Sequence, residues 1–273
     1  MNKKFTTLLF LPALLLGSCA GHGIKLTKEE AGVKINEIKA ASESSLEEQN
    51  QLTITSVANI SQGSEGIKSK SISAFDREKV YIRVEANQIM AYDGERLELD
   101  QTTWLYKDGD KLIYAVEFNL DDGTSMQKDS YYYSFDYSDI TFNEQANEGD
   151  MLSVFDSIDV SKCLLSLEIA FSNTDIASYE VYSKGSGHLY FSIKQDSKTD
   201  IPGEDESLVV KASLECEIIN NILSSYEMDG ETYELEANNK KNDVTKVYSK
   251  IDVKTSATVS YPDLNNFRLS TLN

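Results

Sequence analysis

The sequence predicts an α+β fold: one long, strongly curved antiparallel sheet, an N-terminal helix and a pair of short helices in the middle of the chain. Three observations lead to this prediction. Apolar and polar residues alternate with a period of two over most of the chain, as in strands with one buried face. Tight-turn dipeptides separate many of these segments. The period becomes helical only twice, after Thr27 and again between residues 150 and 171.

The first helix is predicted over residues 28–41. Thr27 is a suitable N-cap, and Glu30 stands three residues later, which completes a capping box. Ala31, Ile35 and Ile38 then follow at helical spacing. The polar stretch that comes next, residues 42–51, is interpreted as a loop.

The strands follow as a series of hairpins. We expect about ten to twelve strands, because apolar alternation recurs between turn signals. The clearest segments are residues 52–60, 80–86, 96–106, 111–120, 131–137, 179–183, 188–194, 208–218, 233–237, 245–253 and 257–261. A strand as long as 208–218 is typical of a curved, strongly twisted sheet.

The turns are the strongest evidence for a meander. Asp-Gly tolerates the positive φ angles that tight hairpins need. A glycine-rich run at residues 184–187 predicts a further turn. The Asp-Gly pairs are Asp93-Gly94, Asp108-Gly109, Asp122-Gly123 and Asp229-Gly230.

The helical pair interrupts the strands over residues 150–171, with Asp150 and Asp159 as caps. Its apolar residues, among them Cys163, share a helical face. No internal repeat and no Pro/Gly/Ser-rich linker divides the chain, so residues 27–273 are predicted to form a single domain.

The start of the chain has the pattern of an export signal. Two lysines precede a mostly apolar stretch, residues 5–16, which is too short to span a bilayer. Gly17 and Ser18 are small, and Cys19 follows them. This pattern resembles a bacterial lipobox. The resemblance implies a signal peptide over residues 1–18, a diacylglyceryl thioether on Cys19 and a lipidated tether over residues 19–26. The alternative is an ordinary signal peptide with a chance cysteine.

Charge narrows the possible partners. The net charge of −19 predicts repulsion from nucleic acid and from anionic lipid headgroups. Membrane attachment would therefore depend on acyl chains at Cys19, and the expected location is the cell membrane, on its extracytoplasmic side. Ala20 supplies no retention acid, and the choice between inner and outer membrane stays open. The oligomeric state is not predicted.

Few residues suggest catalysis or metal binding, so we expect a protein that is not an enzyme and has no metal or cofactor. His22 lies in the tether, and His188 is expected on the surface beside a turn. Cys163 and Cys216 sit on apolar faces and are expected to be buried thiols, with a disulfide as the alternative that export permits. The acidic pairs near residues 108 and 122 lack the spacing of a calcium loop.

Tyrosine is abundant, with 15 residues, and Tyr131-Tyr132-Tyr133 places rings on both faces of one strand. These rings could line a ligand cavity or form a platform for glycan or protein. They could equally reflect the preference of tyrosine for half-buried strands.

The order of elements resembles the LolA/LolB and LppX/LprG class of bacterial lipid- and lipoprotein-carrying proteins. The shared order is lipobox, short tether, N-terminal helix, long meander, mid-chain helical pair and further strands. The resemblance implies a half-barrel whose helices lie over the concave face above an apolar cavity. It therefore implies a lipoprotein that binds a lipid or lipidated precursor. A surface protein that binds glycan or protein through aromatic strand faces is the alternative.

Overall fold

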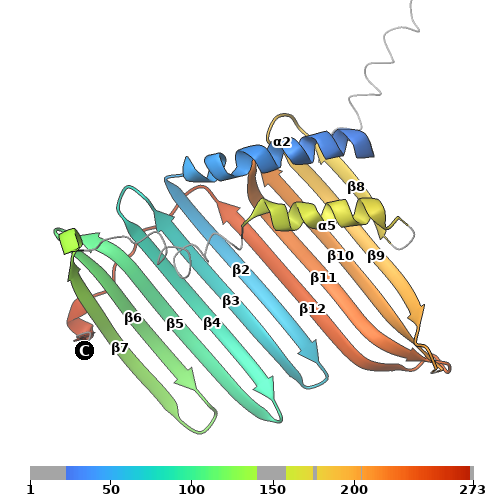
Figure 1. The fold of residues 1–273 in the computed structure, drawn as a ribbon. Coiled ribbons are helices and arrows are strands. Elements are labelled where there is room, and N and C mark those ends of the chain that lie inside the picture. Colours follow the sequence, from blue (N-terminus) through green and yellow to red (C-terminus); the bar gives the residue numbers. More distant parts are fainter. Residues whose placement is uncertain (1–22, 140–157, 175–176, 204, 271–273) are drawn as a thin grey trace, which may run out of the picture.

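A single large sheet organises the protein. The computed structural model describes residues 23–139, 158–174, 177–203 and 205–270, and within them thirteen strands form one sheet in the order β1-β8-β9-β10-β11-β12-β2-β3-β4-β5-β6-β7-β13 (Figure 1). The strands are β1 Ile24–Lys25, β2 Gln51–Gln62, β3 Glu65–Asp76, β4 Tyr81–Tyr92, β5 Glu95–Asp108, β6 Lys111–Asp121, β7 Met126–Asp136, β8 Ala177–Ser183, β9 Leu189–Asp200, β10 Glu206–Ile219, β11 Ile222–Glu236, β12 Lys241–Lys254 and β13 Arg268–Leu269.

The sheet is an open, curved half-barrel, as predicted. Neighbouring strands are antiparallel, except that β13 runs parallel to β7. The end strands β1 and β13 are not paired with each other, so the sheet does not close. Two short 3₁₀ turns, η1 (Tyr137–Asp139) and η2 (Leu264–Asn266), complete the described elements.

Two helices pack on one side of this sheet, over β8–β12 and β2 (Figure 1). We call this side the helix face. Helix α2 spans Lys28–Glu47 and has the predicted capping box, in which Thr27 Oγ1 accepts from Glu30 N–H. The helix is six residues longer than predicted, and the expected loop over residues 42–51 is wrong at its first half. Leu46 packs against the core, which favours continuing the helix.

The mid-chain helix α5 spans Val160–Ser172, with Asp159 as the predicted N-cap. It buries Leu164 and Leu167 against the sheet. The other predicted helix of the pair lies mostly outside the described residues.

The hairpin turns are largely as predicted, with one exception. Asp93 and Gly94 both have positive φ, at 50° and 81°. Asp229-Gly230, however, lies inside β11, where Gly230 pairs with Ala212. The chain turns instead at Asn220-Asn221, both with positive φ, because asparagine also tolerates the left-handed region.

The C-terminal segment, residues 255–267, crosses the opposite side of the sheet, and we call it the strap and that side the strap face. The predicted strand over 257–261 is wrong, since these residues form no ladder. The Tyr81 hydroxyl donates to Ser260 O at 2.7 Å and accepts from Ser260 N–H at 3.0 Å. Trp104 Nε1 also donates to Ser260 O, at 3.0 Å.

The apolar core is therefore divided between the two faces. One cluster lies between the helices and the sheet, and Phe75 packs against it. A second cluster lies under the strap and includes Ala74, the neighbour of Phe75 in β3. Because successive strand residues point to opposite faces, these two neighbours serve different cores.

The described part of the predicted tether is attached to the sheet edge. Ile24 and Lys25 form β1 and pair with Ser183 and Tyr182, and Leu26 N–H donates to Val181 O at 2.9 Å. Residues 24–26 of the predicted tether 19–26 therefore belong to the folded body. Cys19 and the signal sequence lie outside the described residues.

Candidate functional site

An apolar groove runs along the helix face where α5 meets the sheet. Its volume is about 300 Å³, at the lower end of the range for small-ligand sites. Helix α5 supplies one wall, and β8–β11 supply the floor. The apolar lining residues are Ile169, Ala170, Ala177, Ile193, Ala212, Leu214 and Met228.

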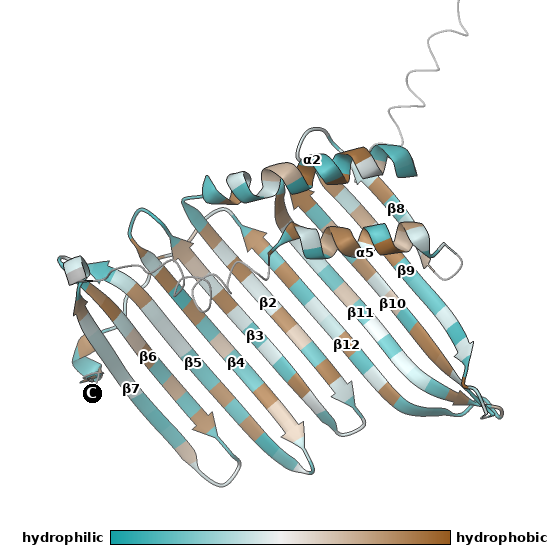
Figure 2. Ribbon diagram, viewed as in Figure 1, coloured by the Kyte–Doolittle hydropathy of each residue, from teal (hydrophilic) through white to brown (hydrophobic). Residues whose placement is uncertain are grey.

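The groove exists because α5 has apolar residues on more than one side. Leu164 and Leu167 are fully buried, whereas Leu165 and Ile169 are each 53% exposed. An exposed large apolar side chain beside a cavity is a recurrent feature of ligand sites. The floor stays open because Ala212 and its cross-strand partner Gly230 are small. Figure 2 shows the apolar residues of α5 and of the neighbouring strands.

The apolar surface extends across the helix face beyond the helices. Five successive cross-strand partners form one row, and Ile60 and Ile67 in it are 49% and 43% exposed. The row consists of Val247, Ile60, Ile67, Met90 and Leu97. The adjoining positions on the same face of β12, β2, β3 and β4 are mostly small: Ser249, Ala58, Ser69, Ser56, Ser71 and Ala86.

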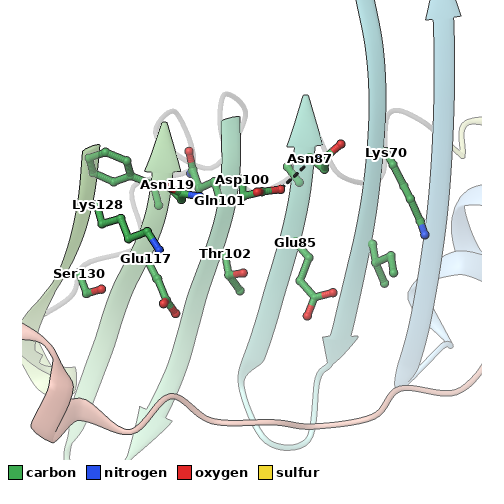
Figure 3. Close-up of a pocket in the computed structure, with 13 residues that line it drawn as sticks. Lys70, Glu85, Asn87, Asp100, Gln101, Thr102, Glu117, Asn119, Lys128 and Ser130 are labelled. Atoms are coloured by element: carbon green, nitrogen blue, oxygen red, sulfur yellow. Dashed lines mark hydrogen bonds between the residues drawn. The ribbon is translucent and has the colours of Figure 1, made fainter. Parts of the chain in front are cut away.

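A polar groove of about 550 Å³ lies on the strap face over β3–β7 (Figure 3). Two adjacent rows of cross-strand partners form its floor, and we call them the polar ladder. The first row is Lys70, Asn87, Asp100, Asn119 and Lys128, and the second is Ile72, Glu85, Thr102, Glu117 and Ser130.

Hydrogen bonds hold only part of the polar ladder. Asn87 Nδ2 donates to Asp100 Oδ1 at 2.6 Å. Asn119 Oδ1 is shielded from solvent and has no hydrogen-bond partner among the described residues. Lys70, Glu117 and Lys128 form no ion pair with any described residue.

The two internal cysteines meet between α5 and β10, where both are free and buried. A hydrogen bond joins the two thiols. That bond and burial raise the pKa of Cys216 well above its ordinary value, while the same bond lowers the pKa of Cys163. Both behave as core residues, as the sequence predicted.

His188 is buried, so its expected surface position is wrong. Its Nδ1 accepts from Lys184 N–H at 2.9 Å, which leaves Nε2 to donate to Glu217 at 3.2 Å. The Ser183 hydroxyl donates a hydrogen bond to the backbone carbonyl oxygen of His188 at 2.7 Å, and not to its imidazole ring. The histidine therefore fastens the β8–β9 turn to β10, and the serine is not placed to pass a proton to the imidazole.

The predicted aromatic strand has rings on both faces. Tyr132 packs against the cluster under the strap. On the helix face, Tyr133 stacks with Phe135 at 6.2 Å between ring centroids, and contacts Tyr131 at 5.8 Å and Tyr114 at 6.2 Å. The apolar groove beside α5 is not lined by these rings.

The described residues contain no group of three or more His, Cys, Asp or Glu side chains that could hold a metal ion. The acidic turn at Asp122 is instead satisfied by its own loop, where Asp122 Oδ1 accepts from Thr124 and Ser125 N–H groups. Within the same described ranges, no helix has the length and apolar character needed to cross a membrane.

Comparison with known proteins identifies no family. No protein-family model and no curated protein matches the chain. A beta-barrel-like protein of the domain of unknown function DUF1849 from Brucella abortus aligns over 75% of this chain and 97% of its own, with 8% identity and a TM-score of 0.26. A chain from a structure described as "Unveiling the Mechanism Behind the in-meso Crystallization of Membrane Proteins" aligns over 74% and 83%, with 12% identity and a TM-score of 0.20.

Proposed function

We propose that this protein is a membrane-anchored bacterial lipoprotein, without enzymatic activity, that binds a hydrophobic ligand on the helix face of its half-barrel. The ligand class is the acyl chain of a lipid or of a lipidated precursor. The apolar groove beside α5 is the observation that supports this proposal most directly. Membership of the LolA/LolB and LppX/LprG class is part of the proposal and rests on the order of elements.

The chemistry of the groove favours an acyl chain over a polar ligand. Its walls are mainly aliphatic, and neither Asp, Glu, Lys nor Arg lines it. Burying a methylene group there would contribute about 0.8 kcal/mol. The half-exposed Ile169 and the row beginning at Ile60 would lose contact with water when a longer chain lies on the face.

The anchor would keep this groove near the bilayer. Because β1 attaches the chain to the sheet edge, few residues separate Cys19 from the folded body. Two or three acyl chains on Cys19 would hold the protein stably on the membrane.

Two measurements test the proposal. Cys19→Ser should move the protein from the membrane fraction to the soluble fraction, and unchanged partitioning would exclude the lipid anchor.

Titration with a fluorescent fatty acid tests the groove. Ala212→Phe should fill the floor and weaken binding about tenfold, whereas Val57→Phe, on the strap face of β2, should leave binding unchanged. Equal affinity in both variants, or no binding to the unmodified protein, would exclude the groove as the site.

The alternative is a surface protein that binds glycan or protein through its aromatic strands, and the ring cluster around Tyr133 is the observation in its favour. Tyr133→Ala would then abolish partner binding. The fatty-acid titration would show no difference between that variant and the unmodified protein.

A further inference from the structure

We propose that the polar ladder on the strap face is a second binding site, for a neutral, polyhydroxylated ligand such as a segment of a glycan chain. This site is separate from the proposed acyl groove, since the two lie on opposite faces of the sheet. The proposal rests on the spacing, the chemistry and the unsatisfied groups of the ladder.

The spacing suits an extended chain of sugars. Side chains of directly paired residues on neighbouring strands repeat about every 4.8 Å. The first row places one polar side chain on each of five consecutive strands, from Lys70 on β3 to Lys128 on β7 (Figure 3). A ligand lying across the strands would meet a new polar group about every sugar unit. Backbone hydrogen bonds join the strands, so the floor of the groove is rigid before the ligand binds.

The functional groups suit hydroxyls. Amides and carboxylates alternate in the first row as Asn87, Asp100 and Asn119. A sugar hydroxyl both donates and accepts, so it can satisfy an amide and a carboxylate placed side by side. The charge of the ladder also favours a neutral ligand, because the charges of its three acids and two lysines nearly cancel. A highly charged ligand would gain little there, and a polyanion would be repelled by the net charge of −19.

A shielded polar atom without a partner distinguishes the ladder from an ordinary solvated sheet face. On the β8–β12 half of the same face, two lysines are paired, with Lys250 3.5 Å from Glu227 and Lys211 3.6 Å from Asp196, whereas Lys198 and Lys246 form no ion pair with a described residue. In the ladder, Lys70, Glu117 and Lys128 have no such partners among the described residues. The side-chain amide oxygen of Asn119, Oδ1, is shielded from solvent and accepts no hydrogen bond from a described residue. A buried acceptor without a donor is costly, so the Asn119 side chain would gain by turning its amide oxygen to a ligand hydroxyl in the groove.

The strap defines one side of the groove. It crosses the same strands at the next row along, where Arg83 is followed by Trp104 and Tyr132. Trp104 is covered, with 8% exposure, and its ring meets Phe267 edge-on at 6.0 Å between centroids. The ladder is therefore bounded by a packed wall on one side and open on the other.

The test uses the soluble Cys19→Ser chain and four defined probes: chitohexaose, cellohexaose, maltohexaose and the polyanion hyaluronan. Calorimetry gives affinities, and amide NMR reports the Asn87 and Asn119 side chains. We expect at least one neutral hexasaccharide to bind, to shift both side-chain amides, and to bind at least tenfold more weakly as its disaccharide.

Asn119→Ala and Asp100→Ala should each weaken that binding at least tenfold. Ser192→Ala, on the same face at β9, is the matched control and should change nothing. Ala212→Phe should also leave glycan binding intact, so the acyl groove and the ladder can fail separately. Binding of hyaluronan alone, binding unaffected by the ladder variants, or no binding by any probe at millimolar concentration would overturn the proposal. Recovery of a protein partner whose binding depends on Asn119, without any glycan binding, would overturn it as well.

Discussion

At the scale of single residues, Tyr81 shows how one side chain joins two parts of the fold. It is 1% exposed, and its hydroxyl makes two hydrogen bonds to the backbone of Ser260. Its ring also meets Tyr261 at 5.4 Å between centroids. Tyr81 therefore supplies both apolar contact and polar partners to a strap that has no ladder of its own.

Tyr81→Phe keeps the ring and removes the hydroxyl. Ser260 N–H then loses its partner, while its carbonyl oxygen keeps Trp104. We expect a loss of about 1–2 kcal/mol in the free energy of unfolding and faster amide hydrogen exchange in residues 256–263. Tyr92→Phe, at a position that is 73% exposed, is the control and should change neither quantity. Unchanged exchange in the strap would show that these hydrogen bonds do not hold it.

Asp122 gives a residue-scale prediction about pH. Hydrogen bonds from the hydroxyl and backbone N–H of Thr124, and from Ser125, hold its pKa well below the ordinary value. Because the folded pKa is the lower one, this turn contributes stability at pH values above the unfolded pKa. That contribution is lost as pH falls through the folded value. Carboxyl NMR should place the Asp122 midpoint well below the ordinary value for an aspartate, and an ordinary midpoint would contradict the turn geometry.

At the scale of elements, the sequence predicts the structure correctly where neighbouring residues alone determine it. The capping box at Thr27 and the Asp93-Gly94 turn depend on neighbouring residues, and both were predictable. Strand β3 was not predictable, because serines and lysines occupy many of its positions and apolar residues do not alternate clearly with polar ones. The strap was misread as a strand because 257–261 alternates while its partners, Tyr81 and Trp104, lie far away in sequence.

The candidate sites were less predictable than the elements. The polar ladder depends on the register of five strands, and a shift of one residue would turn Asn119 to the other face. The groove beside α5 depends on where that helix docks. From the sequence, only the surplus of apolar residues on α5, such as Leu165 and Ile169, could have indicated it.

Helix α2 provides the element-scale prediction. Its first turn is held by Thr27 and Glu30, whose side chain accepts from Thr27 N–H at 2.8 Å. Thr27→Ala should lower the free energy of unfolding by about 1 kcal/mol. Ser44→Ala, exposed near the other end of the helix, should have little effect. Chemical denaturation measures both, and equal values for the two variants would mean that the capping box contributes nothing.

At the scale of the whole molecule, the sheet serves as a shared wall between two cores. The larger cluster joins α2 and α5 to β8–β12 and β2, and the smaller one joins the strap to β3–β6. Neither α2 nor α5 contributes a residue to the smaller cluster. Stability in the β3–β7 half therefore depends on a C-terminal segment that contacts it through a few side chains, such as Phe267 and Leu264.

Removing residues 256–273 tests this division. Trp104 is the only tryptophan, so its fluorescence reports the smaller cluster alone. Without the strap its emission should shift to longer wavelength, and the β3–β7 half should lose on the order of several kcal/mol, since several apolar side chains lose their partners. Hydrogen exchange should speed up in β4 and β5 and stay slow in α5 and β10, because their core does not include the strap. Equal loss of protection in both halves would show that the two clusters form one cooperative unit.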